Sequence, residues 1–116
     1  MAEDFTMQDL HERLGKLGPQ ELVLDVRTAQ EFAEGHVKGA RNIPHEEVAA
    51  HAAELKKYSK IYLHCRSGKR AGIATQALEA AGLKNIVPIT TTGMMHWLEA
   101  GYPVQTAEAG SARGRP

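Results

Sequence analysis

Residues 61–70 read IYLHCRSGKR, an apolar run followed by the only cysteine of the chain and by a polar, basic loop. The run at 61–63 is typical of a strand that is buried on both faces. From about Arg70 onward, small and apolar residues recur at helical spacing until Gly82. The pattern therefore predicts a buried strand, a short glycine-containing loop and a helix, with Cys65 at the carboxyl end of the strand.

Similar elements flank this unit on both sides. Apolar runs predict further buried strands at 22–26 and 86–89, the latter at an edge of the sheet or bent, because it contains Pro88. Thr28 and Glu31 form a capping box, which predicts a helix from Ala29 to Glu34. Helical spacing also predicts helices at 7–17, 48–55 and 94–98. Strands that alternate with helices indicate an α/β fold, with a mostly parallel sheet covered on both faces.

Two helices are expected to bury an apolar stripe. The stripes are Ile73, Ala74, Ala77, Leu78 and Ala81 in the helix after the cysteine loop, and Met94, Trp97 and Leu98 in the last helix. Residues from about 107 onward have little to bury, so we predict one domain at 4–105 and a disordered C-terminal tail at 106–116.

Composition narrows the class of protein. The 116 residues suit a single domain, and 14 basic residues balance 14 acidic ones. Without a basic excess, neither a nucleic-acid partner nor a membrane surface is expected. No apolar run approaches the roughly 20 residues of a membrane span, and no secretory signal is visible at the N-terminus. The expected protein is soluble and cytoplasmic, and its single cysteine excludes an intrachain disulfide.

Cys65 has the surroundings of a reactive thiol. Ligands of open α/β sheets bind at the carboxyl ends of the strands. The start of the following helix offers unpaired N–H groups and a positive dipole end, and Arg66, Lys69 and Arg70 add three cations. Such surroundings lower a thiol pKa, and the thiolate is the nucleophile. We therefore predict that Cys65 is a nucleophile; the alternative is a small buried apolar residue.

Histidines add no second reactive group to this prediction. His64 precedes Cys65 in a strand, where neighbouring side chains point to opposite faces, so it is expected to pack away from the sulfur. The other five histidines show no spacing typical of metal ligands. No metal site is predicted.

Two motifs resemble those of a known family. The first is DVR at 25–27, EF at 31–32, GHV at 35–37 and GARNIP at 39–44; the second is CRSGKR at 65–70. They are similar to the D-V-R…E-[FY]…G-H-[IV]-x-G-A-x-x-[IL]-P and C-R-x-G-x-R motifs of single-domain rhodaneses, which are sulfurtransferases. A weaker similarity covers 93–104, so that the resemblance extends over about residues 4–104.

The resemblance implies a three-layer fold with a five-stranded parallel sheet, and a persulfide on Cys65. Sulfur would come from a small anionic donor such as thiosulfate and leave to a thiophilic acceptor: cyanide, a thiol, or a thiol protein of a sulfur relay. The chain would act as a monomer, and the double displacement would need no metal or organic cofactor. The substrate-binding loop would be Arg66, Ser67, Gly68, Lys69 and Arg70, with backbone N–H groups around the sulfur. Asp25, Arg27 and His36 would support the site, with Asp25 and Arg27 as a charge pair.

Departures and alternatives remain. Thr92 stands before Gly93 where the family usually has a second glycine, which leaves the shape of the bordering loop open. A phosphatase or arsenate reductase of related fold needs C-x5-R, and Arg70 comes one residue too early for it. A sulfur carrier or regulatory module without turnover would need the same thiolate, so the sequence does not separate it from an enzyme.

Overall fold

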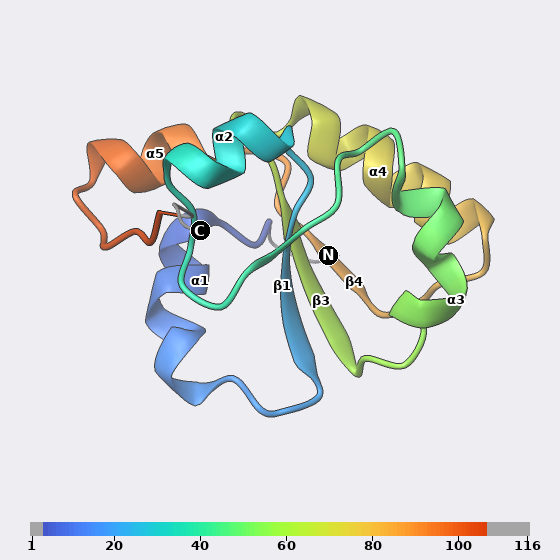
Figure 1. Cartoon of the computed structure of the whole chain (residues 1–116). Helices are drawn as coiled ribbons and strands as arrows, with labels where there is room; N and C mark the ends of the chain where they lie inside the picture. Colours follow the sequence, from blue (N-terminus) through green and yellow to red (C-terminus); the bar gives the residue numbers. More distant parts are fainter. Residues whose placement is uncertain (1–3, 107–116) are drawn as a thin grey trace, which may run out of the picture.

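In a computed structural model, which describes residues 4–106, a four-stranded parallel sheet is flanked by helices (Figure 1). In chain order the elements are α1 (Met7–Arg13), the 3-10 helix η1 (Leu14–Lys16), β1 (Glu21–Asp25), α2 (Ala29–Glu34), β2 (Arg41–Asn42), the 3-10 helix η2 (Val48–His51), α3 (Ala52–Leu55), β3 (Lys60–His64), α4 (Lys69–Ala80), β4 (Ile86–Pro88) and α5 (Met94–Glu99). The predicted α/β class is confirmed.

The strand order is β2-β1-β3-β4, and every neighbouring pair is parallel. The central pair β1 and β3 is in register over five positions, from Glu21 beside Lys60 to Asp25 beside His64. Because the strands are parallel, Asp25 and His64 end at the same edge of the sheet. Pro88 lies in the outer strand β4, as predicted, where its missing N–H costs no bond inside the sheet.

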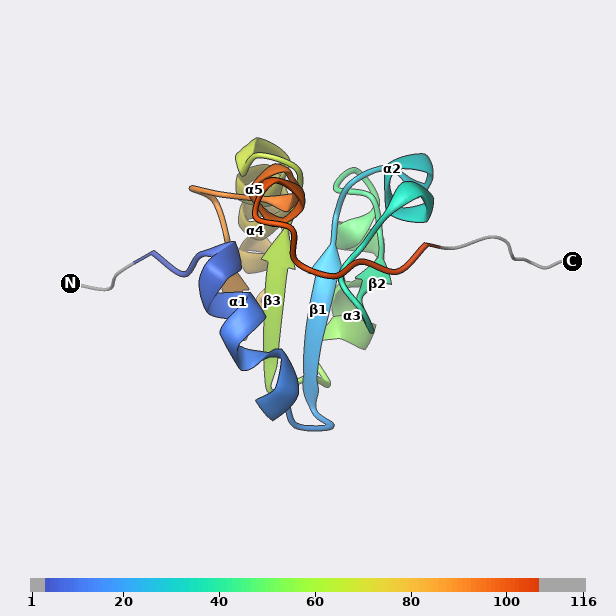
Figure 2. The ribbon, with the colours of Figure 1, turned by 90° about the vertical axis from the view of Figure 1, so that its left-hand side faces the viewer.

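Helices cover both faces of the sheet, with α1 and α5 on one side and α3 and α4 on the other (Figure 1). The alternation of side chains along β1 and β3 separates two apolar clusters: Leu24 and Leu63 pack with the α3–α4 layer, whereas Val23 and Tyr62 pack with the α1–α5 layer. These strands are therefore buried on both faces, as the apolar runs indicate. Helices α2 and α5 both lie toward the carboxyl ends of the strands, α5 above β3 and α2 on the β1–β2 side (Figures 1 and 2).

The sheet has four strands among residues 4–106, whereas five were expected. Near the end of this range Gln105 forms only an isolated antiparallel bridge with His36, through N–H···O distances of 2.9 and 2.8 Å. Pro103, two residues earlier, has no N–H to extend the pairing. Strand β2 has only two residues, too few to stand out as an apolar run.

Two predicted stripes are partly wrong. Ile73 and Ala81 of the first stripe are exposed, and the buried positions of α4 are Ala71, Ala74, Thr75 and Leu78. These four form a regular i, i+3, i+4, i+7 face, whose small residues allow the helix to approach the sheet closely. In α5, Met94 and Trp97 are fully buried but Leu98 is 54% exposed.

The predicted tail lies, apart from Thr106, outside the described residues, and the domain limits stay a prediction. Across residues 4–106, no helix is long and apolar enough to cross a membrane.

Candidate active site

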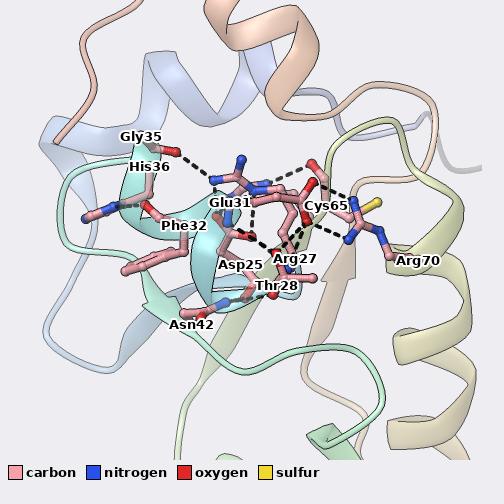
Figure 3. Close-up of polar contacts among 11 residues, drawn as sticks. Asp25, Arg27, Thr28, Glu31, Phe32, Gly35, His36, Asn42, Cys65 and Arg70 are labelled. Carbon is pink, nitrogen blue, oxygen red and sulfur yellow. Dashed lines mark hydrogen bonds and ion pairs between the residues drawn. The ribbon is translucent and has the colours of Figure 1, made fainter. Parts of the chain in front are cut away.

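Cys65 directly follows β3, and its sulfur faces the amino end of α4 (Figure 3). The Sγ atom accepts hydrogen bonds from the backbone N–H groups of Gly68, at 3.0 Å, and Ala71, at 3.2 Å. Of the loop residues 66–70, whose backbone N–H groups were expected around the sulfur, only Gly68 donates such a bond among the described residues. The second donor, Ala71, lies one position after this loop. The side chain is 1% exposed and belongs to the apolar cluster of the α3–α4 layer, so Cys65 is more deeply buried than the sequence indicates.

The loop around the sulfur is clamped from the far side by the start of α5. The N–H of Met94 donates to the Cys65 carbonyl at 2.8 Å, and the N–H of Met95 donates to the Arg66 carbonyl at 3.0 Å. Gly93 permits this approach, because a Cβ there would lie 2.2 Å from the Arg66 oxygen. Gly68 is equally constrained: its φ is +114°, and a Cβ would lie 1.9 Å from the Thr90 oxygen.

Thr92 occupies the position at which the first glycine of a Gly-Gly pair was expected. Its hydroxyl accepts a hydrogen bond from the N–H of Met7 at 2.9 Å, which satisfies one of the unpaired donors of the first turn of α1. Since the close contact with the cysteine loop is made by Gly93, threonine at position 92 is compatible with the clamped loop.

Arg70 is held in an ion pair that the sequence does not reveal. Its guanidinium donates to both carboxylate oxygens of Glu31, at 2.7 and 3.1 Å (Figure 3). This hydrogen-bonded pair is the main reason why the pKa of Glu31 lies at about 2, below its ordinary value of 4.5. Glu31 was predicted only as a capping residue, and it does close the capping box with Thr28. Its second partner lies 39 residues away, where no local pattern can indicate it.

Arg66 and Lys69 are placed differently from Arg70. Both side chains are exposed, and within residues 4–106 neither forms an ion pair. Of the three predicted cations, Arg70 is thus neutralised and the other two face solvent. Ser67 is also exposed.

The predicted charge pair is present at the carboxyl end of β1. Asp25 is fully buried and Arg27 is 4% exposed; Nη2 of Arg27 lies 2.7 Å from Oδ2 of Asp25 and Nε lies 3.0 Å from Oδ1. The same Nη2 donates to the Gly35 carbonyl at 2.7 Å, which ties the end of α2 to the sheet. Asn42, which sequence reasoning missed, donates from its amide to the carbonyls of Asp25 and Arg27, at 3.0 and 2.9 Å.

Within residues 4–106, neither of the buried histidines, His36 and His64, forms a hydrogen bond with the sulfur. His36 stacks on Phe32 with ring centroids 3.7 Å apart, and its Nδ1 lies 2.7 Å from the Phe32 carbonyl oxygen. His64 is fully buried; its Nε2 lies 4.0 Å from Oδ2 of Asp25 and has no hydrogen-bond partner in the part of the chain that the structure describes. Burial holds the pKa of His64 below its ordinary value, although the nearby Asp25 acts in the opposite direction.

A pocket of about 330 Å³ lies between α2 and α5, next to the cysteine loop. Its lining is Arg27, Glu31, Glu34, Gly35, Arg66, Met94, Met95, Leu98 and Glu99. Cys65 is not part of this lining, but Arg66 follows it and Met94 is hydrogen-bonded to its carbonyl. Residues 4–106 contain no group of three or more side chains arranged to hold a metal ion.

Comparison with known proteins gives consistent results. The family model of the rhodanese-like domain matches residues 6–100. Thiosulfate sulfurtransferase 18 of Arabidopsis thaliana is 30% identical over 92% of this chain and 88% of its own length. The putative sulfur carrier protein YrkF of Bacillus subtilis is 35% identical over 65% of this chain. The chain spans 40% of the length of YrkF and 51% of that of a second Bacillus subtilis relative. A crystal structure of a rhodanese-related protein from Thermoplasma volcanium has a TM-score of 0.75 at 31% identity, and the match covers 91% of this chain and 100% of that one.

Proposed function

Because the chain belongs to the rhodanese-like domain family, we propose that it is a sulfurtransferase that carries a sulfane sulfur as a persulfide on Cys65. The observation that supports this proposal best is the position of the sulfur, which accepts N–H groups from Gly68 and Ala71 at the amino end of a twelve-residue helix. Backbone donors and a helix dipole favour the anionic form of a thiol and of its persulfide.

The reaction runs in two displacements. The Cys65 thiolate attacks the outer sulfur of a donor such as thiosulfate; a new S–S bond forms, the S–S bond of thiosulfate breaks, and sulfite leaves with the electron pair. A thiophilic acceptor then attacks the outer sulfur of the persulfide. With cyanide, thiocyanate is released and the Cys65 thiolate returns to its initial state. Each half-reaction exchanges one anion for another, so no external oxidant or reductant is needed.

Two features of the structure bear on how the sulfur is reached. Because Cys65 is only 1% exposed, the site must open before a donor reaches the sulfur. Arg66 and Lys69 are the exposed cations that attract an anionic donor to the loop, whereas Arg70 must first exchange its contact with Glu31. The alternative function is a sulfur carrier, which forms the same persulfide but passes it only to a partner protein. The similarity to the putative sulfur carrier protein YrkF supports that alternative.

The test is an intact-protein mass spectrum, recorded after incubation with thiosulfate and again after addition of cyanide. We expect the mass to rise by one sulfur atom and then to return, with release of thiocyanate. In Cys65→Ser, which keeps the size of the buried side chain, no gain is expected. A protein that gains no sulfur from thiosulfate or from a polysulfide would contradict the proposal. A persulfide that forms but is not discharged by any small acceptor would establish the carrier instead.

A further inference from the structure

The pocket between α2 and α5 adjoins the cysteine loop through Arg66. Both helices stand beyond the carboxyl ends of the strands, on the same edge of the sheet as the cysteine loop (Figures 1 and 2). Arg66 belongs to both the loop and the pocket lining, and buried Met94 links the pocket to the Cys65 carbonyl through its N–H at 2.8 Å. The pocket is therefore continuous with the loop but supplies no group to the sulfur itself.

Some of the charged side chains that line the pocket have an ion-pair partner among the described residues, and others do not. Two of them are satisfied inside the protein: Arg27 by Asp25, and Glu31 by Arg70. Arg66, Glu34 and Glu99 also line the pocket, are exposed, and form no ion pair within the part of the chain that the structure describes. The pocket therefore offers one available cation and two available carboxylates.

This arrangement suits a small molecule that carries charges of both signs. Inside the pocket, a dianion such as thiosulfate would find Arg66 as the one available cation and two glutamates that repel it. An aminothiol would instead place an ammonium group near the glutamates, a carboxylate near Arg66, and its carbon atoms against Met95 and Leu98, which are 43% and 54% exposed. A volume of about 330 Å³ is at the lower end for small-molecule sites, which suits a ligand of amino-acid to tripeptide size.

We propose that Glu34 and Glu99 give this pocket a preference, among the small thiols that accept sulfur from the Cys65 persulfide, for those that carry an ammonium group. The inference rests on the proposed function. In the step concerned, the thiolate of the acceptor attacks the outer sulfur of the persulfide. The S–S bond to Cys65 breaks, a new persulfide forms on the small thiol, and the Cys65 thiolate takes the electron pair.

The experiment uses the full chain, loaded with sulfur by thiosulfate or a polysulfide and freed of excess donor. Discharge by cysteine, cysteamine, N-acetylcysteine and cyanide is followed by intact-protein mass after rapid quenching, and rates are compared per thiolate. Cysteine and cysteamine keep the ammonium group, whereas N-acetylcysteine lacks it. We expect the first two to discharge the persulfide about three- to tenfold faster than N-acetylcysteine at low salt, and the advantage to shrink as salt screens the charges.

The decisive comparison is the double variant Glu34→Gln/Glu99→Gln, matched by Glu12→Gln/Glu79→Gln, which makes the same charge change at exposed positions outside the pocket. In the pocket variant only, the ratio of the discharge rate with cysteine to the discharge rate with N-acetylcysteine should fall toward the ratio set by the intrinsic reactivities of the two thiols. Comparing this ratio between variants cancels those intrinsic reactivities. An unchanged ratio in the pocket variant, or an equal fall in both, would overturn the inference. So would a persulfide that only a protein thiol discharges. Failure of sulfur loading would instead refute the proposed function, so the two failures are distinguishable.

Discussion

The ion pair between Glu31 and Arg70 joins the start of α2 to the helix that carries the active-site loop, and Glu31→Gln tests what it contributes. Glutamine keeps a side-chain oxygen that can accept the N–H of Thr28, so the capping box survives. The substitution removes the negative charge opposite Arg70 and replaces one of the two oxygens that Arg70 contacts by an amide nitrogen. The loss of stability therefore reports mainly on the ion pair with Arg70, with a smaller contribution from the charge in the first turn of α2.

The magnitude follows from the pKa of Glu31. A value of about 2 against an ordinary 4.5 sets an upper limit of about 3 kcal/mol on what this ionisation adds to the free energy of unfolding. The side chains of Arg70 and Glu31 are 25% and 26% exposed, so water screens their attraction. We therefore expect Glu31→Gln to cost about 1–2 kcal/mol at pH 7.

The sign of the pH dependence is fixed by the lowered pKa. Because the carboxyl group binds its proton more weakly in the folded state, its contribution is complete above pH 4.5 and is lost as the pH falls toward 2. More than half of the difference between wild type and variant should be gone at pH 3.

Urea unfolding at pH 7 and pH 3 measures both differences. Glu34→Gln is the matched control, because Glu34 lies on the same helix, is exposed, and has only a 3.4 Å contact with the Gln30 amide. Its effect should stay within about 0.5 kcal/mol. Equal stability of Glu31→Gln and wild type at pH 7, or a difference that persists undiminished at pH 3, would refute the reasoning.

Two further substitutions probe the site. In Gly93→Ala the new Cβ would lie 2.2 Å from the Arg66 oxygen. We therefore expect the free energy of unfolding, measured with urea, to fall by at least about 2 kcal/mol, and persulfide formation, followed by intact mass, to be slower. Gly15→Ala, whose Cβ would have no atom within 4 Å, is the control, and equal effects at both positions would contradict the clamped loop. His64, buried beside Asp25 and Arg27 with a lowered pKa, should bind its proton more readily in the unfolded chain, so the free energy of unfolding should fall as the pH drops below about 6.5. His64→Gln should flatten the stability profile between pH 7 and 5, and profiles of equal slope would show that His64 is not the group responsible.

Local patterns predicted most of the secondary structure. The capping box of Thr28 and Glu31 gave the helix from Ala29 to Glu34, with the same bounds as α2. The apolar runs placed β1 and β3 because both strands are buried on both faces. These features depend on residues within about one turn or one strand of each other, which is the range over which a sequence pattern is informative.

Other features depend on contacts between distant segments and could not be predicted in this way. The pairing of Glu31 with Arg70 spans 39 residues, and the bond from Met7 to Thr92 spans 85. Exposure of Ile73 and Leu98 follows from how α4 and α5 rotate against the sheet, which periodicity alone leaves open. Cys65 lies at a strand end as predicted, but its burial depends on an apolar cluster whose members, such as Leu24 and Val48, are remote from it in the chain.

The contacts around Cys65 separate what holds the sulfur from what chooses its substrate. The groups that hold the sulfur are backbone N–H groups, and the carbonyls of Cys65 and Arg66 are turned away from it toward α5. The exposed side chains of Arg66, Ser67 and Lys69 take no part in these bonds. Replacing those three residues would therefore alter the charge and shape met by an incoming molecule while leaving the anion site intact. A protein built in this way can acquire a new donor or acceptor by few surface substitutions, without rebuilding its nucleophile.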